Sequence, residues 1–217
     1  MPPWSYSSLT NFETCPFQFY RLRVKKDIVQ QETEATVWGT QCHSALEHRV
    51  QNKTPLPEWA RQWEPLAARF DRFNSVFVER KYGLTKSFQP TGFFDKDCWY
   101  RGVIDLGVSG RIALLLDWKT GKQKDDHDQL KLFSVTHMAA EPETQACRTG
   151  YIWLKNNKIT RQDFTREDIP IIWQEFLPRI RRLELAYDAD KWPHKPSGLC
   201  RGWCPVKDCP HYRSKTR

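Results

Sequence analysis

The feature that most constrains the fold is a pair of apolar segments, residues 99–108 and 111–119, separated by a Ser109-Gly110 turn. Both segments are rich in Val, Ile and Leu, and residues 112–116 form an uninterrupted apolar run. Such a run is typical of a strand that is buried on both faces of a sheet. The two segments therefore predict a β-hairpin at the centre of a sheet, with the other elements packed around it.

The segments around this hairpin alternate between helical and strand patterns. We expect helices at residues 8–23, 36–51, 125–140 and 166–188, and a charged amphipathic segment at 58–75. Strands are expected at residues 76–84, 150–155 and 158–164, and the last two form a second hairpin across residues 156–157. This order predicts a mixed α/β (α+β) fold in which helices flank one central mixed sheet.

The chain length favours one medium domain with an appendage, because 217 residues exceed a usual domain of roughly 150 only by half. Hydrophobic residues make up 39% of the chain, which is enough for a core and excludes wholesale disorder. Breaks are expected at residues 52–57, 89–97 and 192–209. We therefore predict a core over residues 1–190 and a Cys-rich segment over residues 191–217.

The net charge of +8 is concentrated near the C-terminus, where residues 179–217 hold ten basic and four acidic residues. A polyanionic partner such as nucleic acid and an ordinary solvated tail explain this excess equally well. The N-terminus lacks the pattern of a signal peptide, and no apolar run is long enough to span a bilayer. We expect a cytoplasmic protein, in the host cytoplasm if it is viral, with no membrane partner.

Acidic residues in the central hairpin indicate a metal site. Asp105 lies in an apolar strand, where an ionised carboxylate is costly unless a positive charge compensates it. Asp117 and Lys119 are two residues apart on the next strand and share a face, whereas the Trp118 carbonyl points sideways. Carboxylate and carbonyl oxygens suit Mg²⁺, and a neighbouring lysine suits phosphodiester chemistry. The alternative for Asp117 and Lys119 is a surface ion pair.

His43 follows Gly39 in an expected helix and is a further candidate ligand. A lone helical histidine is usually a packed or an exposed side chain. Its neutral imidazole would nevertheless suit Mn²⁺ beside two carboxylates if the fold brought it there. The metal site therefore depends on one spatial condition, that His43 meets Asp105 and Asp117 around a shared ion.

Four motifs occur in the order seen in RecB-like nucleases of the PD-(D/E)XK superfamily, and in them the chain resembles that family: Gly39-Thr40-x-x-His43, Gly102-Val103-Ile104-Asp105, Asp117-Trp118-Lys119-Thr120-Gly121 and Gln129-Leu130-x-x-Phe133. The resemblance implies a restriction-endonuclease-like core and assigns roles to the matching positions. It implies Mg²⁺ or Mn²⁺ ligands at His43, Asp105, Asp117 and the Trp118 carbonyl, a catalytic lysine at Lys119 and a helper at Gln129.

Two further positions bear on the resemblance. Many relatives carry a glutamate at the place of Glu79, so this residue could support the metal or the lysine, although a charged residue on an edge strand explains it equally well. The family often has tyrosine where this chain has Phe133. The missing hydroxyl puts a role for position 133 in doubt.

Four of the seven cysteines predict a second metal site. Three of them cluster in the C-terminal segment, and a fourth near the N-terminus can join them because chain ends are often neighbours in space. Four thiolates suit an iron-sulfur cluster or tetrahedral zinc, for which His194 or His211 is a possible substitute ligand, and chance clustering of free thiols is the alternative. The four expected ligands are Cys15, Cys200, Cys204 and Cys209. Cys42, Cys98 and Cys147 are expected to be packing residues.

The segment around Cys15 resembles the iron-sulfur subgroup of RecB-like nucleases, which includes the AddB-type and CRISPR-associated enzymes. Its pattern is Ser8-Leu9-x-x-Phe12-x-x-Cys15-Pro16-x-x-Phe19-Tyr20. The resemblance implies that the four cysteines hold a [4Fe-4S] cluster. The C-terminal spacing departs from the more usual x₂ and x₅ pattern, so structural Zn²⁺ stays an alternative.

Together these features predict a metal-dependent DNA nuclease. The resemblance favours an exonuclease that acts on single strands or duplex ends in recombination, repair or phage DNA processing, with a helicase or recombination partner. Exposed aromatic residues are expected to stack unpaired bases. Basic residues are expected to guide the phosphate backbone: Arg21, Arg23, Lys25, Lys26, Arg179, Arg181 and Arg182. The alternatives are a noncatalytic nucleic-acid-binding or scaffold module with a structural metal cluster, and a nuclease that acts on RNA.

Overall fold

The computed structural model describes residues 1–214 and divides the chain into two compact units. The sheet unit is Thr33–Trp173, and the terminal unit combines Met1–Glu32 with the described residues from Gln174 onward. This division differs from the predicted boundary at residue 190, because the N-terminal segment groups with the C-terminal part of the chain. Lys215 and Arg217, two of the basic residues counted in the C-terminal charge excess, lie outside the described residues.

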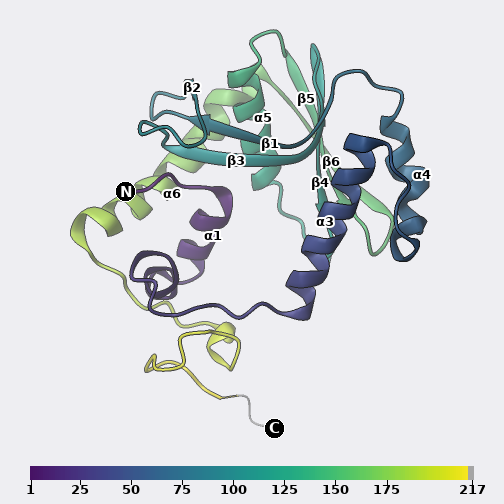
Figure 1. Cartoon of the computed structure of the whole chain (residues 1–217). Coiled ribbons are helices and arrows are strands. Elements are labelled where there is room, and N and C mark those ends of the chain that lie inside the picture. The colour runs from purple at the N-terminus through teal and green to yellow at the C-terminus, as the bar shows by residue number, and fades with distance from the viewer. Residues whose placement is uncertain (215–217) are drawn as a thin grey trace. The chain divides into compact units, whose positions relative to one another are not determined.

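The sheet unit is built on one mixed sheet of six strands in the order β2-β1-β3-β4-β5-β6 (Figure 1). All neighbouring strands are antiparallel except β4 and β5, which are parallel and are connected through α5. The prediction of a mixed α/β fold with a central sheet is therefore confirmed. The strands are β1 (Val76–Leu84), β2 (Pro90–Thr91), β3 (Tyr100–Val108), β4 (Ile112–Lys119), β5 (Ala146–Trp153) and β6 (Lys158–Thr165).

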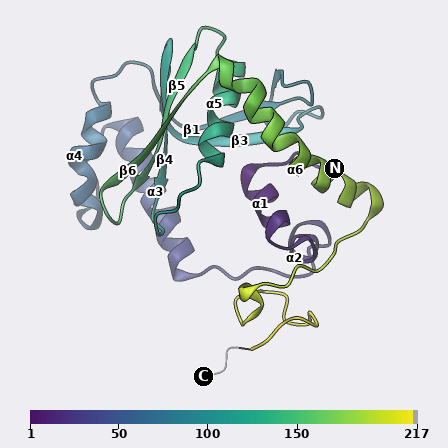
Figure 2. The ribbon, with the colours of Figure 1, turned by 180° about the vertical axis from the view of Figure 1, so that it is seen from behind.

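Helices cover both faces of this sheet. Helix α3 (Glu34–Asn52) crosses one face, and helix α5 (Asp128–Ala140) lies on the other, as Figures 1 and 2 show from opposite sides. Helix α3 begins two residues before the predicted start because the Thr33 hydroxyl caps it by accepting a hydrogen bond from the Thr36 N–H. Helix α5 begins three residues later than predicted, after a turn in which the Asp126 carboxylate accepts from the Asp128 N–H.

The main core lies between the sheet and α3. Cys42 and Leu46 of α3 are fully buried and belong to one apolar cluster with Leu106 and Trp118 of the central strands. The predicted amphipathic segment completes this cluster as three short helical turns rather than one helix. These turns are η2 (Glu58–Trp63), α4 (Glu64–Ala67) and η3 (Ala68–Phe70).

The terminal unit corrects the prediction of one helix over residues 8–23. Helix α1 (Tyr6–Thr14) ends at Cys15, whose backbone is extended at φ −162°, and α2 (Pro16–Phe19) and the π-turn η1 (Tyr20–Val24) follow. The break has a local cause, because a residue that precedes proline avoids the helical conformation. Cys15 is therefore placed in a corner between two helices.

The remaining helical segments are η4 (Arg166–Asp168), α6 (Ile169–Ala189) and η5 (Gly198–Cys200). Helix α6 starts in the sheet unit and continues into the terminal unit, where Arg179 forms an ion pair with Glu13 of α1 at 2.7 Å. Within the described residues, none of the helices combines the length and the apolar character needed to traverse a bilayer.

Candidate metal centre

The candidate centre lies where the pairing of β1 and β3 is interrupted. The ladder runs through Val78–Leu106 and resumes at Arg80–Ile104, so Glu79 and Asp105 stand opposite each other without forming a regular pair. Glu79 also has φ 45°, in the left-handed region. This conformation costs a non-glycine residue roughly 1–2 kcal/mol and persists only where the surrounding structure holds it. The interruption turns two carboxylates toward one point on the α3 side of the sheet.

Three side chains converge at this point. His43, Glu79 and Asp105 each offer one ligand atom, and these atoms lie within 4.8 Å of one another. His43 Nδ1 lies 3.2 Å from Asp105 Oδ2. Across residues 1–214, no other group of three His, Cys, Asp or Glu side chains meets this spacing. The donors are one imidazole nitrogen and two carboxylate oxygens, a set that suits Mn²⁺ or Mg²⁺.

The backbone of Trp118 lies beside this group. Its N–H donates to Asp105 Oδ2 at 3.0 Å, and a backbone hydrogen bond joins Trp118 to the His43 imidazole. These contacts hold both predicted ligands in place. The indole of Trp118 is buried in the core, as expected for a strand residue whose neighbours face the opposite side.

Asp117 is turned toward Lys119 and Gln129 and does not belong to the group of three. The Lys119 ammonium lies 2.6 Å from Asp117 Oδ2. The Gln129 side chain bridges the pair, because its Nε2 donates to Asp117 Oδ1 at 2.8 Å and its Oε1 accepts from Lys119 Nζ at 2.9 Å. Asp117 is only 2% exposed, and its Oδ2 has the Lys119 ion pair but no well-directed hydrogen bond. A buried oxygen in this state is open to a further cationic partner.

The electrostatics of the centre favour cation binding. Burial raises the pKa of Asp105 well above its ordinary value, and the nearby charge of Asp117 raises it further. Burial also raises the pKa of Glu79, with added repulsion from Glu47 and Asp117. The pKa of His43 is lowered, mainly by burial, so the neutral imidazole with a free lone pair is favoured. A bound cation would stabilise the ionised carboxylates that these surroundings disfavour.

The structure thus brings His43, Asp105 and the Trp118 backbone together and joins Asp117 to Lys119 and Gln129. It assigns Glu79 a more central place than its sequence signal suggested. The sequence signals for this residue are a charge directly after the apolar strand start, Val76 to Val78, and the glutamate that many RecB-like relatives carry at this place. Phe133 is 2% exposed and packs in the core, consistent with the absence of a tyrosine hydroxyl at this position.

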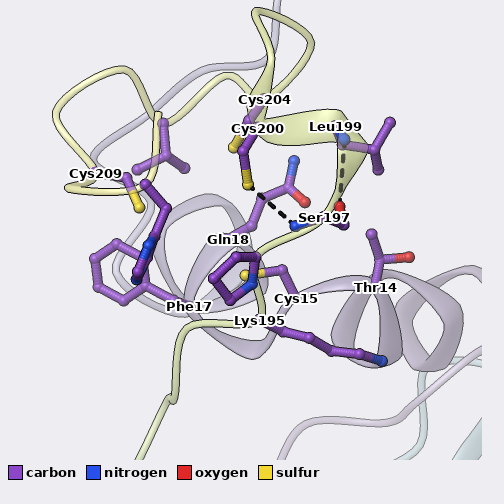
Figure 3. Close-up of a pocket in the computed structure, with 13 residues that line it drawn as sticks. Thr14, Cys15, Phe17, Gln18, Lys195, Ser197, Leu199, Cys200, Cys204 and Cys209 are labelled. Carbon is purple, nitrogen blue, oxygen red and sulfur yellow. Dashed lines mark hydrogen bonds between the residues drawn. The ribbon is translucent and has the colours of Figure 1, made fainter. Parts of the chain in front are cut away.

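The four predicted cysteines face one hollow of the terminal unit (Figure 3). All four are free thiols, and Cys200 Sγ accepts a hydrogen bond from the Ser197 N–H at 3.5 Å. The pKa of the Cys204 thiol is raised by burial and then by the nearby charges of Cys200, Cys15 and Cys209. In contrast, Cys42, Cys98 and Cys147 are buried in the sheet unit as packing residues, as predicted.

Most of the basic residues predicted to follow the phosphate backbone are paired with carboxylates. Arg21 contacts Asp27 at 2.8 Å and Asp208 at 2.9 Å. Arg23 and Lys26 have no ion pair within the described part of the chain. The paired residues are Arg21, Lys25, Arg179, Arg181 and Arg182. Their charges are partly neutralised, which reduces the field available for a polyanion.

Comparisons with known proteins agree with the fold. The family model described as the PD-(D/E)XK nuclease superfamily matches residues 3–209, so the chain belongs to this superfamily, whose members generally use divalent metals. A crystal structure from Eubacterium rectale, described as a candidate exonuclease, has a TM-score of 0.59 at 12% identity and covers 99% of this chain and 90% of its own.

A second crystal structure, that of SSO0001, has a TM-score of 0.54 at 14% identity, with coverage of 99% of this chain and 89% of its own. At these identities the likeness extends to the fold alone. No curated protein matches the sequence.

Proposed function

We propose that the protein is a metal-dependent deoxyribonuclease, and specifically an exonuclease that acts on single strands or duplex ends. The observation that carries the proposal is the convergence of ligand atoms of His43, Glu79 and Asp105 within 4.8 Å, beside the buried Asp117 and its partly exposed ion-pair partner Lys119. Superfamily membership supports nuclease chemistry in general. DNA as the substrate, the exonuclease mode and a role in recombination, repair or phage DNA processing with a helicase partner are inferred from the motif resemblance.

His43, Glu79 and Asp105 would hold Mg²⁺ or Mn²⁺, with the Trp118 carbonyl and Asp117 as further oxygen donors. When bound, such a cation polarises the phosphodiester and makes water a better nucleophile at neutral pH. The fit rests on the donor chemistry and on the buried Asp117 Oδ2, which forms an ion pair with Lys119 but has no hydrogen-bond partner among the described residues.

The chain itself contributes a positioned ammonium. Lys119 Nζ is held between Asp117 Oδ2 and Gln129 Oε1, so its direction is set before substrate binds. From there its third N–H group donates to a nonbridging phosphate oxygen and stabilises the charge that develops there. Gln129 acts as a positioning residue, because its amide binds the acid and the ammonium together.

The experiment uses end-labelled linear single-stranded DNA and circular single-stranded DNA of the same sequence, each with Mn²⁺ and with Mg²⁺. We expect the wild type to degrade the linear strand and leave the circle intact, and Lys119→Ala to lose activity by at least two orders of magnitude, as removal of one charge-stabilising donor does elsewhere. The matched control is Lys53→Ala, an exposed lysine at the C-terminal end of α3.

Each proposed detail has its own contrary outcome. Equal cleavage by Lys119→Ala removes this lysine from the mechanism, and cleavage of the circle removes the exonuclease mode. An RNA strand of the same sequence, degraded faster than DNA, would reassign the substrate. DNA binding without turnover under both metals would support the noncatalytic binding module instead.

For the terminal unit we propose that Cys15, Cys200, Cys204 and Cys209 hold a [4Fe-4S] cluster that joins the two ends of the chain. The support is that all four thiols line one hollow (Figure 3). In the described residues no three of the sulfurs lie within 4.8 Å of one another. Tetrahedral zinc, with bonds of about 2.3 Å, holds its sulfurs roughly 3.8 Å apart. The wider spacing therefore favours the cluster over zinc. Iron and visible absorption in anaerobically purified protein are expected, and stoichiometric zinc without iron would replace the cluster by structural Zn²⁺.

A further inference from the structure

Two cationic side chains, Lys81 and Arg101, project from the same face of the sheet as the candidate metal centre. Side chains alternate along β3 from Arg101 to Asp105, so Arg101 and Val103 emerge on the face that Asp105 presents to His43. The interruption of the ladder beside Glu79 breaks this alternation after Asp105, so Leu106 also faces α3. Lys81 of β1 pairs with Val103 and therefore emerges on this face too. Arg101 and Asp105 are four residues apart, which corresponds to roughly 13 Å along a strand.

The contacts of neighbouring residues on β1 and β3 agree with this assignment of faces. Tyr82 follows Lys81 in β1 and must point to the opposite side, and its hydroxyl lies 2.9 Å from His137 Nδ1 of α5. The core on the α3 side is built from Leu106 and Val108, at the other end of β3 from Arg101. The cations therefore stand beyond the part of the sheet that α3 covers.

A hydrogen-bonded loop places two aromatic rings next to these cations. Phe93 and Phe94 follow Gly92, whose N–H donates to Asp95 Oδ2 at 2.8 Å, and the Asp95 N–H donates back to the Gly92 carbonyl at 3.0 Å. A Cβ at Gly92 would lie 2.6 Å from the Asp95 carboxylate oxygens, so a side chain at this position would displace the carboxylate that closes the turn. Phe94 is nevertheless 75% exposed. The loop thus holds a large aromatic ring in water at a defined position.

The rings and the cations form one compact cluster. Arg101 Cζ lies 5.2 Å from the centre of the Phe93 ring and 5.5 Å from that of Phe94. Lys81 Nζ lies 5.8 Å from both ring centres. Unlike most of the basic residues predicted to follow the phosphate backbone, Lys81 and Arg101 form no ion pair with any carboxylate among residues 1–214. We call Lys81, Phe93, Phe94 and Arg101 the cation-aromatic cluster.

We propose that the cation-aromatic cluster binds the DNA strand a few nucleotides from the phosphate held at the metal centre. Lys81 and Arg101 contact successive backbone phosphates, and the exposed Phe94 ring stacks on a base. The cation-aromatic cluster lies on the same face of β3 as Asp105. A single DNA strand can therefore reach both the cluster and the candidate metal centre. Stacking on Phe94 requires an unpaired base, which selects single-stranded or frayed DNA over an intact duplex. This inference rests on the proposed function.

The test measures binding separately from cleavage. Fluorescence anisotropy of a labelled single strand is recorded with Ca²⁺ in place of Mg²⁺ or Mn²⁺, over a series of KCl concentrations. Each phosphate contact on a single strand contributes about 0.7 to the slope of log affinity against log salt. The double variant Lys81→Ala with Arg101→Ala is expected to lower this slope by about 1.4. Arg111→Ala, an exposed arginine in the turn after β3, is the matched control and should keep the wild-type slope.

Phe94 is tested by two substitutions. Phe94→Leu should weaken single-strand affinity about tenfold, within the range for loss of one stacked base, while the salt slope stays unchanged. Phe94→Trp retains an aromatic face and should bind as the wild type does. Thermal melting of each variant establishes that it is folded, and the affinity of a blunt hairpin duplex should respond little to either change.

The outcomes separate this inference from the proposed function. If the cluster variants bind single strands with wild-type affinity and salt slope while the wild type still cleaves, the cluster assignment is wrong and the nuclease proposal stands. If the wild type never cleaves but the variants lose binding as described, the nuclease proposal fails and the binding cluster stands. A wild type that binds no single strand at low salt overturns the cluster directly.

Discussion

His137 provides a quantitative test of the packing between α5 and β1. Its side chain is fully buried, its ring stacks on Phe77 with centroids 5.8 Å apart, and its Nδ1 lies 2.9 Å from the Tyr82 hydroxyl. Burial lowers the pKa of His137 from 6.5 to about 4; the charge of Glu141 opposes this effect, and that of Arg80 adds to it. The folded protein therefore resists protonation of this imidazole.

The direction of the pH effect follows from the two pKa values. Between pH 6.5 and 4 the unfolded chain binds a proton at His137 that the folded protein does not, so stability falls as the pH is lowered through this range. The interval between the two values corresponds to about 3 kcal/mol at 1.36 kcal/mol per pH unit. About 2 kcal/mol of this should be lost between pH 7 and pH 4.5.

The assay is urea unfolding at pH 7 and at pH 4.5, for the wild type and for His137→Asn, whose amide can still serve the Tyr82 hydroxyl. Other titrating groups are common to both proteins and cancel in the difference. The wild type should lose about 2 kcal/mol more than the variant on acidification. His48→Asn, which changes an exposed histidine of α3, should follow the wild type. Parallel losses in the wild type and His137→Asn would refute the claim that this imidazole is kept neutral by burial.

Three further predictions concern other parts of the sheet unit. Glu79→Gln should weaken Mn²⁺ affinity about 10- to 100-fold by calorimetry, whereas Glu47→Gln, in the same hollow but outside the ligand group, should change it little; equal losses would contradict the assignment. Gly107→Ala should cost about 1–3 kcal/mol in urea unfolding, because its Cβ would lie 2.1 Å from the Phe77 ring. Arg166→Met should cost about 1–3 kcal/mol, since this guanidinium donates to four backbone carbonyls at and beyond the end of α5; unchanged midpoints would contradict either prediction.

The sequence predicted those helices and strands well whose formation depends only on the residues of one segment. The strand at residues 76–84 and the hairpin around Ser109-Gly110 occur as expected, because strand period and turn chemistry act over neighbouring residues. The prediction of one helix over residues 8–23 was wrong for an equally local reason. Pro16 keeps Cys15 out of the helical conformation, and the prediction gave the helical pattern more weight than this effect.

The candidate metal centre was also predictable from the sequence only in part. The types of ligand, the Asp-x-Lys spacing and the separation of Lys119 from Gln129 are readable in the chain, because they depend on strand alternation and on short connections. The central position of Glu79 in the group of candidate ligands could not be predicted from the sequence. Its position depends on φ 45° at one residue and on an interrupted ladder between β1 and β3, which arise only when two strands and α3 pack together.

By itself, the amino-acid sequence determined the mixed α/β class, the order of its main elements and the candidates for metal ligands, since these follow from periodicity and side-chain chemistry. Tertiary structure alone decided which of them meet. It placed His43 beside Asp105, turned Asp117 toward Lys119 and Gln129, and aligned Lys81 with Arg101 on the same face. Such contacts join residues far apart in the chain, so they depend on strand register and helix packing, which no local pattern specifies.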